Sequence, residues 1–150
     1  CSVYCYKDNI YLNAHKPLKA VKTIRTMPYP GFPTDAQSIF LAVLSKAKGT
    51  SVMVENIFES RYRQVGELVR MGCQIKTEGK VAIVEGVKKL YGAKVVATDL
   101  RGGAALVLAG LAAQGETVIS NVKLIDRGYE AIETPLASVG ADIKRITAEF

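Results

Sequence analysis

The side chains of this 150-residue sequence best suited to chemistry are two aspartates and two arginines, Asp35, Asp99, Arg101 and Arg127. A guanidinium group binds a carboxylate or a phosphate through two parallel hydrogen bonds, so the arginines could hold a small anion. A carboxylate can accept a proton from a substrate only when it lies within hydrogen-bonding reach. Simpler roles stay open: Asp99 could form a structural ion pair with an arginine, and Asp35 could merely stabilise a helix dipole.

A stiff segment leads to Asp35. Residues 28–37 read PYPGFPTDAQ, and their three prolines restrict both their own backbone angles and those of the preceding residues. A loop that is ordered before binding loses little entropy when a ligand arrives. Thr34 and Gln37 have the spacing of a capping box, which predicts a helix that begins near Asp35.

The aspartates and arginines belong to an internal repeat. Residues 34–61 and 98–127 both open with Thr-Asp, continue through an apolar run, a glycine and a β-rich patch, and close on arginine. The paired positions are Asp35 and Asp99, Gly49 and Gly115, Arg61 and Arg127, and Gly72 and Gly140. Each unit is predicted to contain a helix, a strand, a second helix and a pair of strands.

The elements of the first unit follow from its pattern. The helix from Asp35 should stop before Gly49, SVMVE at 51–55 should be a strand, and residues 62–71 should be a helix. Residues 73–86 predict two strands around a Glu-Gly turn.

Residues 1–14 resemble residues 73–86, with a strand, a polar turn and a strand, so the chain is expected to begin partway through a unit of a longer protein. Such a unit would leave a sheet edge exposed and prone to association. In the last unit, residues 102–114 are apolar on every face, which predicts a helix buried all round, either ringed by sheets or simply central.

The overall composition excludes several classes of protein. The net charge of +6 comes from scattered Lys and Arg residues, which suits a small anion as well as a nucleic acid, or simply a solvated surface. The longest apolar run, residues 102–113, is too short to cross a membrane, and the first residues do not resemble a signal peptide. We expect a cytoplasmic protein without membrane contact.

The cysteines and the histidine offer little for metal or nucleophilic chemistry. Cys1, Cys5 and Cys73 are an odd number at unpatterned spacing, and His15 stands alone. This argues against a disulfide framework, a metal site or a Ser-His-Asp triad. The cysteines are expected to be reduced and structural.

Four motifs in order, PYPGFPTDAQ, FESR, ATDLRGGAALVLAG and IDRGYEAIE, resemble the UDP-N-acetylglucosamine 1-carboxyvinyltransferase family of enolpyruvyl transferases. The resemblance covers about residue 15 to residue 146. The sister enzymes of the shikimate pathway share the repeat, but the PYPGFPTD loop distinguishes the family named here.

The resemblance implies an α/β fold of βαβαββ repeats around a pseudo-threefold axis, with helices inside and sheets outside. The whole enzyme would have two such domains with ligands between them. The present chain would be one domain, part of the C-terminal one. Its parts would be residues 1–33 as the tail of a first repeat and a loop, 34–97 as a second repeat and 98–150 as a third.

The resemblance also implies roles in the second repeat, residues 34–97. Asp35 corresponds to the carboxylate that contacts the sugar 3-hydroxyl and is proposed as the general base. Ile57 corresponds to a position against the UDP-sugar, with Phe58 beside it, and Arg61 is counted among the substrate-binding residues. Alternatively, Ile57 and Phe58 are core residues at a strand end.

In the last repeat, the resemblance implies that Arg127 contacts phosphoenolpyruvate directly, that Arg101 lies nearby and that Asp99 lines the same cleft. Phosphoenolpyruvate carries both a carboxylate and a phosphate, the two groups that arginine binds best.

The implied reaction transfers the enolpyruvyl group of phosphoenolpyruvate to the 3-hydroxyl of UDP-N-acetylglucosamine, at the first committed step of peptidoglycan synthesis. It needs no cofactor and no metal. The family's proton-donating cysteine lies in the other domain, and no cysteine here matches it, so this chain alone is predicted to be inactive without the missing N-terminal domain.

The other interpretation is a non-catalytic binding module with a transferase-like repeat, possibly for nucleic acid. It would need a basic stripe interleaved with exposed aromatic residues. Only Tyr4, Tyr6 and Tyr11, near Lys7, resemble such a stripe, so nucleic acid is an unlikely partner.

Overall fold

The computed structural model describes residues 2–147. The strands are β1 (Ser2–Tyr6), β2 (Asn9–Asn13), β3 (Thr23–Arg25), β4 (Thr50–Val54), β5 (Gln74–Glu78), β6 (Val81–Glu85), β7 (Leu90–Tyr91), β8 (Lys94–Val96), β9 (Ala113–Gln114) and β10 (Val118–Ser120). The helices are α1 (Thr34–Leu44), α2 (Val65–Arg70), α3 (Leu100–Leu111), α4 (Lys123–Asp126) and α5 (Glu133–Ser138).

The first complete unit is built on a four-stranded sheet with the order β3-β4-β6-β5. β3 and β4 run parallel with α1 between them in sequence, whereas β4 and β5 are both antiparallel to β6. The strand pair around Glu78-Gly79 is therefore confirmed. The strand predicted at residues 51–55 is present but lies one residue earlier, so Glu55 falls outside it. The second predicted helix is also present, but α2 begins at Val65 rather than near residue 62.

The second unit repeats the parallel arrangement on a smaller scale. β8 and β10 are parallel with α3 between them in sequence, as β3 and β4 are with α1. The paired glycines agree in conformation, with φ of +112° and +85° at Gly49 and Gly115 and +91° and +96° at Gly72 and Gly140. Residues 141–147, by contrast, form no strand, so the strand pair expected there is not found in the described part of the chain.

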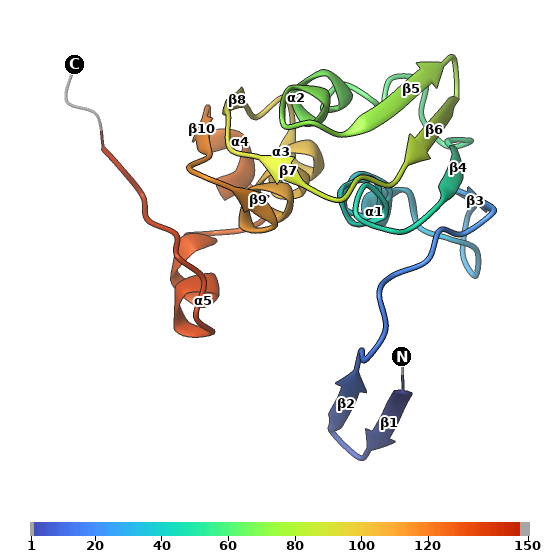
Figure 1. The fold of residues 1–150 in the computed structure, drawn as a ribbon, viewed down its shortest axis with the longest axis horizontal. Coiled ribbons are helices and arrows are strands. Elements are labelled where there is room, and N and C mark those ends of the chain that lie inside the picture. Colours follow the sequence, from blue (N-terminus) through green and yellow to red (C-terminus); the bar gives the residue numbers. More distant parts are fainter. Residues whose placement is uncertain (1, 148–150) are drawn as a thin grey trace.

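The core lies where α1 and α3 pack against each other, with the strands around them (Figure 1). Leu41 of α1, Leu106 of α3 and Met53 of β4 are all fully buried in one cluster. Burying a side chain of this size stabilises a fold by about 1.5–3 kcal/mol. This is the helices-inside, sheets-outside arrangement expected from the sequence. α3 is buried on most of its surface, as predicted, but Leu111 at its end is 41% exposed.

The capping box predicted at Thr34 and Gln37 is wrong. Thr34 already lies inside α1, whose N-cap is Pro33, and no side chain caps the helix. The Thr34 hydroxyl instead donates to the buried carboxylate of Glu55, at 2.9 Å. Gln37 is fully buried and accepts from Ser38. Tertiary partners thus replace the local capping bonds, although the helix begins where expected.

The first residues form the predicted antiparallel hairpin, β1 with β2, which projects from the rest of the structure (Figure 1). Cys5 in β1 is exposed, so its assignment as a structural cysteine is wrong, whereas Cys73 is buried and burial raises the pKa of its thiol. Both are free thiols. Cys1 lies outside the described residues.

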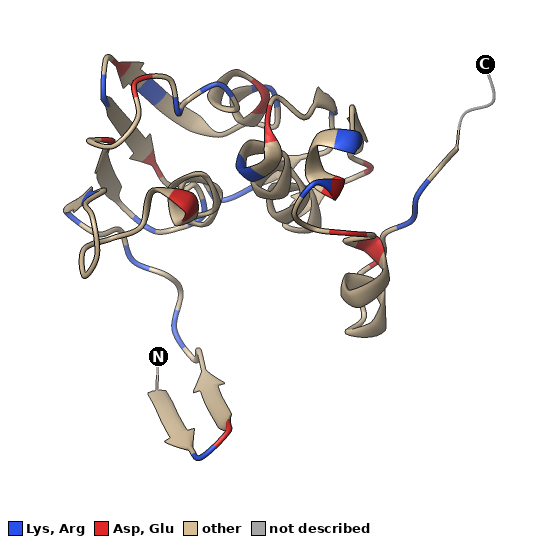
Figure 2. Ribbon diagram, turned by 180° about the vertical axis from the view of Figure 1, so that it is seen from behind, with Lys and Arg blue, Asp and Glu red and all other residues tan. Residues whose placement is uncertain are grey.

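Charged residues are dispersed over the ribbon rather than collected on one face (Figure 2). The helices within residues 2–147 are all too short or too polar to cross a membrane.

Candidate functional site

The proline-rich loop before α1 is closed by its own backbone. Met27 N donates to Phe32 O at 3.0 Å, and Gly31 N donates to Pro28 O at 2.8 Å. A side chain at Gly31 would clash, because its Cβ would overlap Met27 Cβ. The peptide bond between Tyr29 and Pro30 is cis. Hydrogen bonds therefore add to the restriction that the prolines impose.

This loop and the start of α1 line a cavity of about 470 Å³. The lining residues are Met27, Pro28, Tyr29, Pro30, Gly31, Pro33, Thr34, Asp35 and Ile57. Asp35 and Ile57, two of the residues predicted to bind substrate, thus share one cavity.

Asp35 forms ion pairs with two arginines that are distant in sequence. Arg61 Nη2 lies 2.8 Å from Asp35 Oδ1, and Arg101 Nη2 lies 3.0 Å from Oδ2. The hydrogen bond from Arg101 is the main reason why the pKa of Asp35 lies below its ordinary value, and the charges of both arginines contribute. The Asp35 side chain is still 58% exposed, so one face of an ionised carboxylate remains open.

Aromatic rings support both arginines. The Arg61 guanidinium lies over the Phe58 ring, 4.6 Å from its centre, and that of Arg101 lies 5.6 Å from the centre of the Tyr129 ring. Arg101 also donates to the Tyr129 hydroxyl at 3.2 Å. Its hydrogen bonds with Asp35 and Tyr129 raise the pKa of Arg101. Both cations are thus held in place from two sides.

Ile57 and Phe58 follow β4 and remain accessible, with 40% and 50% of their surfaces exposed. The alternative that they are core residues is therefore wrong. Their backbone N–H groups donate to Glu55 Oε1 at 2.8 and 3.0 Å, which fixes the loop that carries them.

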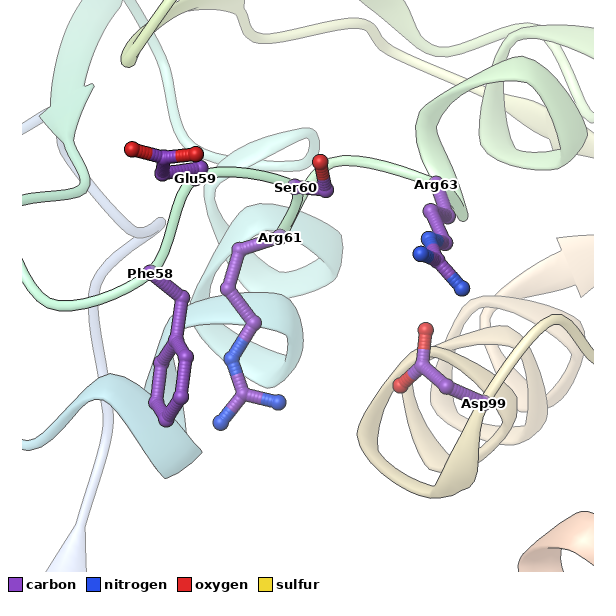
Figure 3. A pocket seen from close by; sticks show the side chains of 6 residues that line it. All are labelled: Phe58, Glu59, Ser60, Arg61, Arg63 and Asp99. Carbon is purple, nitrogen blue, oxygen red and sulfur yellow. The ribbon is translucent and has the colours of Figure 1, made fainter.

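A second cavity of about 470 Å³ lies between this loop and the start of α3 (Figure 3). Its lining residues are Phe58, Glu59, Ser60, Arg61, Arg63 and Asp99. In Figure 3, Arg63 points toward Asp99 across the cavity. Arg63 was missed by sequence reasoning, because nothing in its spacing distinguishes it from a surface arginine.

Asp99 is placed beside this cavity by its role as the N-cap of α3. Its Oδ1 accepts from Gly102 N at 2.8 Å. The structural ion pair considered for Asp99 is not found among the described residues, where the aspartate that pairs with Arg101 is Asp35.

Arg127 is the C-cap of α4 and is exposed. It neither contacts Asp35 nor lines either cavity. The structure therefore brings Asp35, Arg61 and Arg101 together with Ile57, Phe58 and Asp99 close by, but leaves Arg127 apart from them.

Glu55 is the other residue that sequence reasoning missed. Its only sequence signal is an acidic side chain at the end of the predicted strand 51–55, which does not distinguish it from an ordinary exposed strand end. Glu55 is in fact 1% exposed. In residues 2–147 there is no cluster of three or more His, Cys, Asp or Glu side chains that could hold a metal ion.

The curated relatives of this chain include enolpyruvyl transferases at high identity. The UDP-N-acetylglucosamine 1-carboxyvinyltransferase 2 of Caldanaerobacter subterraneus subsp. tengcongensis is 55% identical over 146 residues, which cover 97% of this chain and 35% of the relative. The UDP-N-acetylglucosamine 1-carboxyvinyltransferase of Zymomonas mobilis is 54% identical over 93% of this chain and 33% of its own length. The chain thus spans about a third of these two relatives.

Solved structures agree with the sequence relatives. The enolpyruvyl transferase NikO from Streptomyces tendae matches with a TM-score of 0.79 and 30% identity, over 91% of this chain and 31% of that one. An EPSP synthase from Acinetobacter baumannii matches with a TM-score of 0.60 and 28% identity, over 75% of this chain and 26% of that one. The family described as EPSP synthase (3-phosphoshikimate 1-carboxyvinyltransferase) matches residues 6–136. This chain, with its paired units and central helices, therefore belongs to that family of enolpyruvyl transferases.

Proposed function

We propose that the complete protein transfers the enolpyruvyl group of phosphoenolpyruvate to the 3-hydroxyl of UDP-N-acetylglucosamine. The observation that carries this proposal is the likeness to relatives of that name, at 54–55% identity over nearly the whole chain. The geometry supports it, because a partly exposed carboxylate that lines one cavity is paired with two arginines, one of which, Arg61, lines the neighbouring cavity. The reaction would serve peptidoglycan synthesis, and through it cell shape and division.

Asp35 is the proposed general base. Its two ion pairs keep the carboxylate ionised but also lower its pKa, which makes it a weaker base. An incoming phosphate or carboxylate would compete for the same guanidinium groups. We therefore expect Arg101, whose hydrogen bond is the main cause of the lowered pKa, to turn toward phosphoenolpyruvate while Arg61 stays on Asp35. The loss of the Arg101 bond raises the basicity of Asp35 when the sugar hydroxyl is in place.

The remaining predicted contacts belong to the same proposal. Ile57 and Phe58 would lie against the UDP-sugar, Asp99 would line the cleft, and Arg127 would contact phosphoenolpyruvate. Arg127 lines neither of the two cavities, so its contact with phosphoenolpyruvate would lie in a part of the cleft outside them. The opposite wall and the proton donor would come from the N-terminal domain. We also propose that the reaction takes place in the cytoplasm.

The test is an assay of the complete protein with phosphoenolpyruvate and either UDP-N-acetylglucosamine or 3-phosphoshikimate, followed by phosphate release and product mass. We expect transfer to the UDP-sugar and none to 3-phosphoshikimate. The opposite preference would overturn the assignment. The 150-residue chain alone should release no phosphate above a protein-free control. Release that Asp35→Ala abolishes would show that the active site lies within this chain.

The structure adds little to the nucleic-acid alternative. Tyr4, Tyr6 and Tyr11 are exposed on the hairpin, but Lys7 is its one basic residue and Asp8 follows directly. Salt-dependent retention of the chain on a polyphosphate column would favour that alternative, whereas flow-through at low salt would exclude it.

A further inference from the structure

Glu55 is a buried carboxylate whose hydrogen bonds reach both parts of the candidate site. It lies directly after β4 and is 1% exposed. Among the described residues it forms no ion pair with any Lys or Arg. A buried charge without a cation must be stabilised by hydrogen-bond donors, since the loss of hydration is otherwise too costly.

Four donors surround this carboxylate. Oε1 accepts from the Thr26 hydroxyl at 2.9 Å and from the backbone nitrogens of Ile57 and Phe58 at 2.8 and 3.0 Å. Oε2 accepts from the Thr34 hydroxyl at 2.9 Å. One oxygen therefore holds the loop of the proposed sugar contacts, and the other faces the start of α1.

The bond to Thr34 has a consequence for Arg61. A hydroxyl has one proton, and Thr34 donates it to Glu55, so the hydroxyl oxygen is left to accept. Arg61 Nε donates to that oxygen at 3.3 Å, while its Nη2 donates to Asp35 at 2.8 Å. The direction of the Thr34 hydroxyl thus orients the guanidinium toward Asp35.

We propose that Glu55 is a positioning residue of the transfer reaction, which fixes Arg61 on Asp35 through the Thr34 hydroxyl and holds the Ile57-Phe58 loop through its other oxygen. The inference rests on the proposed function, and it adds a residue that contacts no substrate. The Thr34 hydroxyl donates to the Glu55 carboxylate, and an amide NH₂ group in the same place would have to donate to the hydroxyl instead.

Glu55→Gln isolates this effect. An amide oxygen in the place of Oε1 keeps the bonds from Thr26, Ile57 and Phe58. The NH₂ group then replaces Oε2 and donates to one lone pair of the Thr34 hydroxyl, whose proton no longer has an acceptor at residue 55. This proton is free to take the position that Arg61 Nε uses, so the hydroxyl no longer offers a fixed acceptor and Arg61 should lose its fixed position. Thr34→Val removes the same link from the other side, and Thr34→Ser keeps it.

The experiment measures turnover in the complete protein for Glu55→Gln, Thr34→Val, their double variant and Thr34→Ser. Each of the first two should lower turnover about tenfold, and the double variant should be no slower than the worse single one, because all three break one chain of contacts. Thr34→Ser should stay within about twofold of the parent. The control is Glu85→Gln, which makes the same change at an exposed position of β6 in the same sheet and should also stay within about twofold.

Two results would overturn the inference. One is a double variant whose loss of turnover is the product of the losses in Glu55→Gln and Thr34→Val. The other is a Glu55→Gln variant that turns over as fast as the parent. If Glu55→Gln does not fold, Thr34→Val and Thr34→Ser decide, and equal turnover in both overturns it. An inactive parent would instead refute the proposed function. A crystal structure of Glu55→Gln then decides independently of activity: Arg61 displaced from Thr34 supports the inference, and Arg61 unmoved overturns it. If that variant does not fold, the crystal structure of Thr34→Val is judged by whether Arg61 has left Asp35.

Discussion

The two units of the chain open their central helices with the same Thr-Asp pair, but the two aspartates act differently. Asp99 is the N-cap of α3 and accepts from the backbone nitrogen of Gly102. Asp35 lies inside the first turn of α1, makes no cap and faces two arginines. The repeated Thr-Asp pair therefore marks a helix start in both units, but only in the first unit does the aspartate pair with arginines.

The strand ends show the same divergence. Asn56 after β4 and Asn121 after β10 both donate from their side chains to the carbonyl that follows the neighbouring parallel strand, that of Thr26 and that of Ala97. The residue before Asn56 is the buried Glu55, whereas Ser120 precedes Asn121. The scaffold contact is repeated, but the carboxylate that orders Thr34 and Arg61 exists once. We infer that Asp35 and the groups that order it belong mainly to the first unit, and that the second contributes Arg101 to Asp35 and Asp99 to the neighbouring cavity.

The largest effect should come from exchanging the two aspartates for asparagine in the complete protein. Asp35→Asn removes the proposed base, and turnover should fall about 100-fold or more. Asp99→Asn should lower turnover less than about tenfold, because asparagine caps a helix as well as aspartate does. Phosphate release at saturating substrates measures both. Equal losses in the two variants would contradict the distinction between the units.

The next effect concerns Arg127, which occupies the place in the second unit that Arg61 has in the first. Arg127→Lys keeps the charge but loses the two-pronged contact, so phosphoenolpyruvate should bind about tenfold more weakly while UDP-N-acetylglucosamine binds as before. Calorimetric titration of each ligand gives the two affinities. Arg70→Lys, on the exposed side of α2, is the matched control. Unchanged phosphoenolpyruvate affinity in Arg127→Lys would make Arg127 a purely structural residue.

A smaller effect on stability would sharpen the assignment of Asp99 as a cap. Asp99→Ala should lower the free energy of unfolding by about 1 kcal/mol, whereas Asp99→Asn should change it by only a few tenths. Denaturant unfolding of the complete protein, monitored by circular dichroism, compares them. Similar losses for Ala and Asn would mean that the charge of Asp99, rather than its capping hydrogen bond, matters.

The smallest effect concerns the pKa of Asp35, which one arginine from each unit lowers. Because its pKa is lowered, its ion pairs stabilise the fold above the ordinary value of 3.8 and lose that contribution as the pH falls through the lowered pKa. The contribution is small, since the side chain is 58% exposed. Arg101→Met should raise the pKa of Asp35 more than Arg61→Met does, because the hydrogen bond from Arg101 is the largest cause. Carboxyl-carbon NMR titration measures this order, and the reverse order would assign the dominant contact to the first unit.

Local patterns predicted much of the scaffold. The hairpin at residues 2–13, the strands on either side of Glu78-Gly79 and the start of α1 all depend on spacing within a few residues. The burial of α3 followed from its apolar composition on every face. The prediction failed at Thr34, where the capping box was locally favourable but Glu55 offered a buried partner from another strand.

By itself, the amino-acid sequence determined the two repeated units, their main elements and the family to which the chain belongs, because these depend on periodicity, turn residues and contiguous motifs. Only the tertiary structure decided that Arg61 and Arg101 both meet Asp35, that Arg127 does not, and that Glu55 is buried among four donors. These contacts join residues far apart in the chain and arise when α1 packs against α3 and β3 pairs with β4. No local spacing encodes them, since the free energy of a buried carboxylate or a shared ion pair depends on partners that only the folded packing brings within hydrogen-bonding distance.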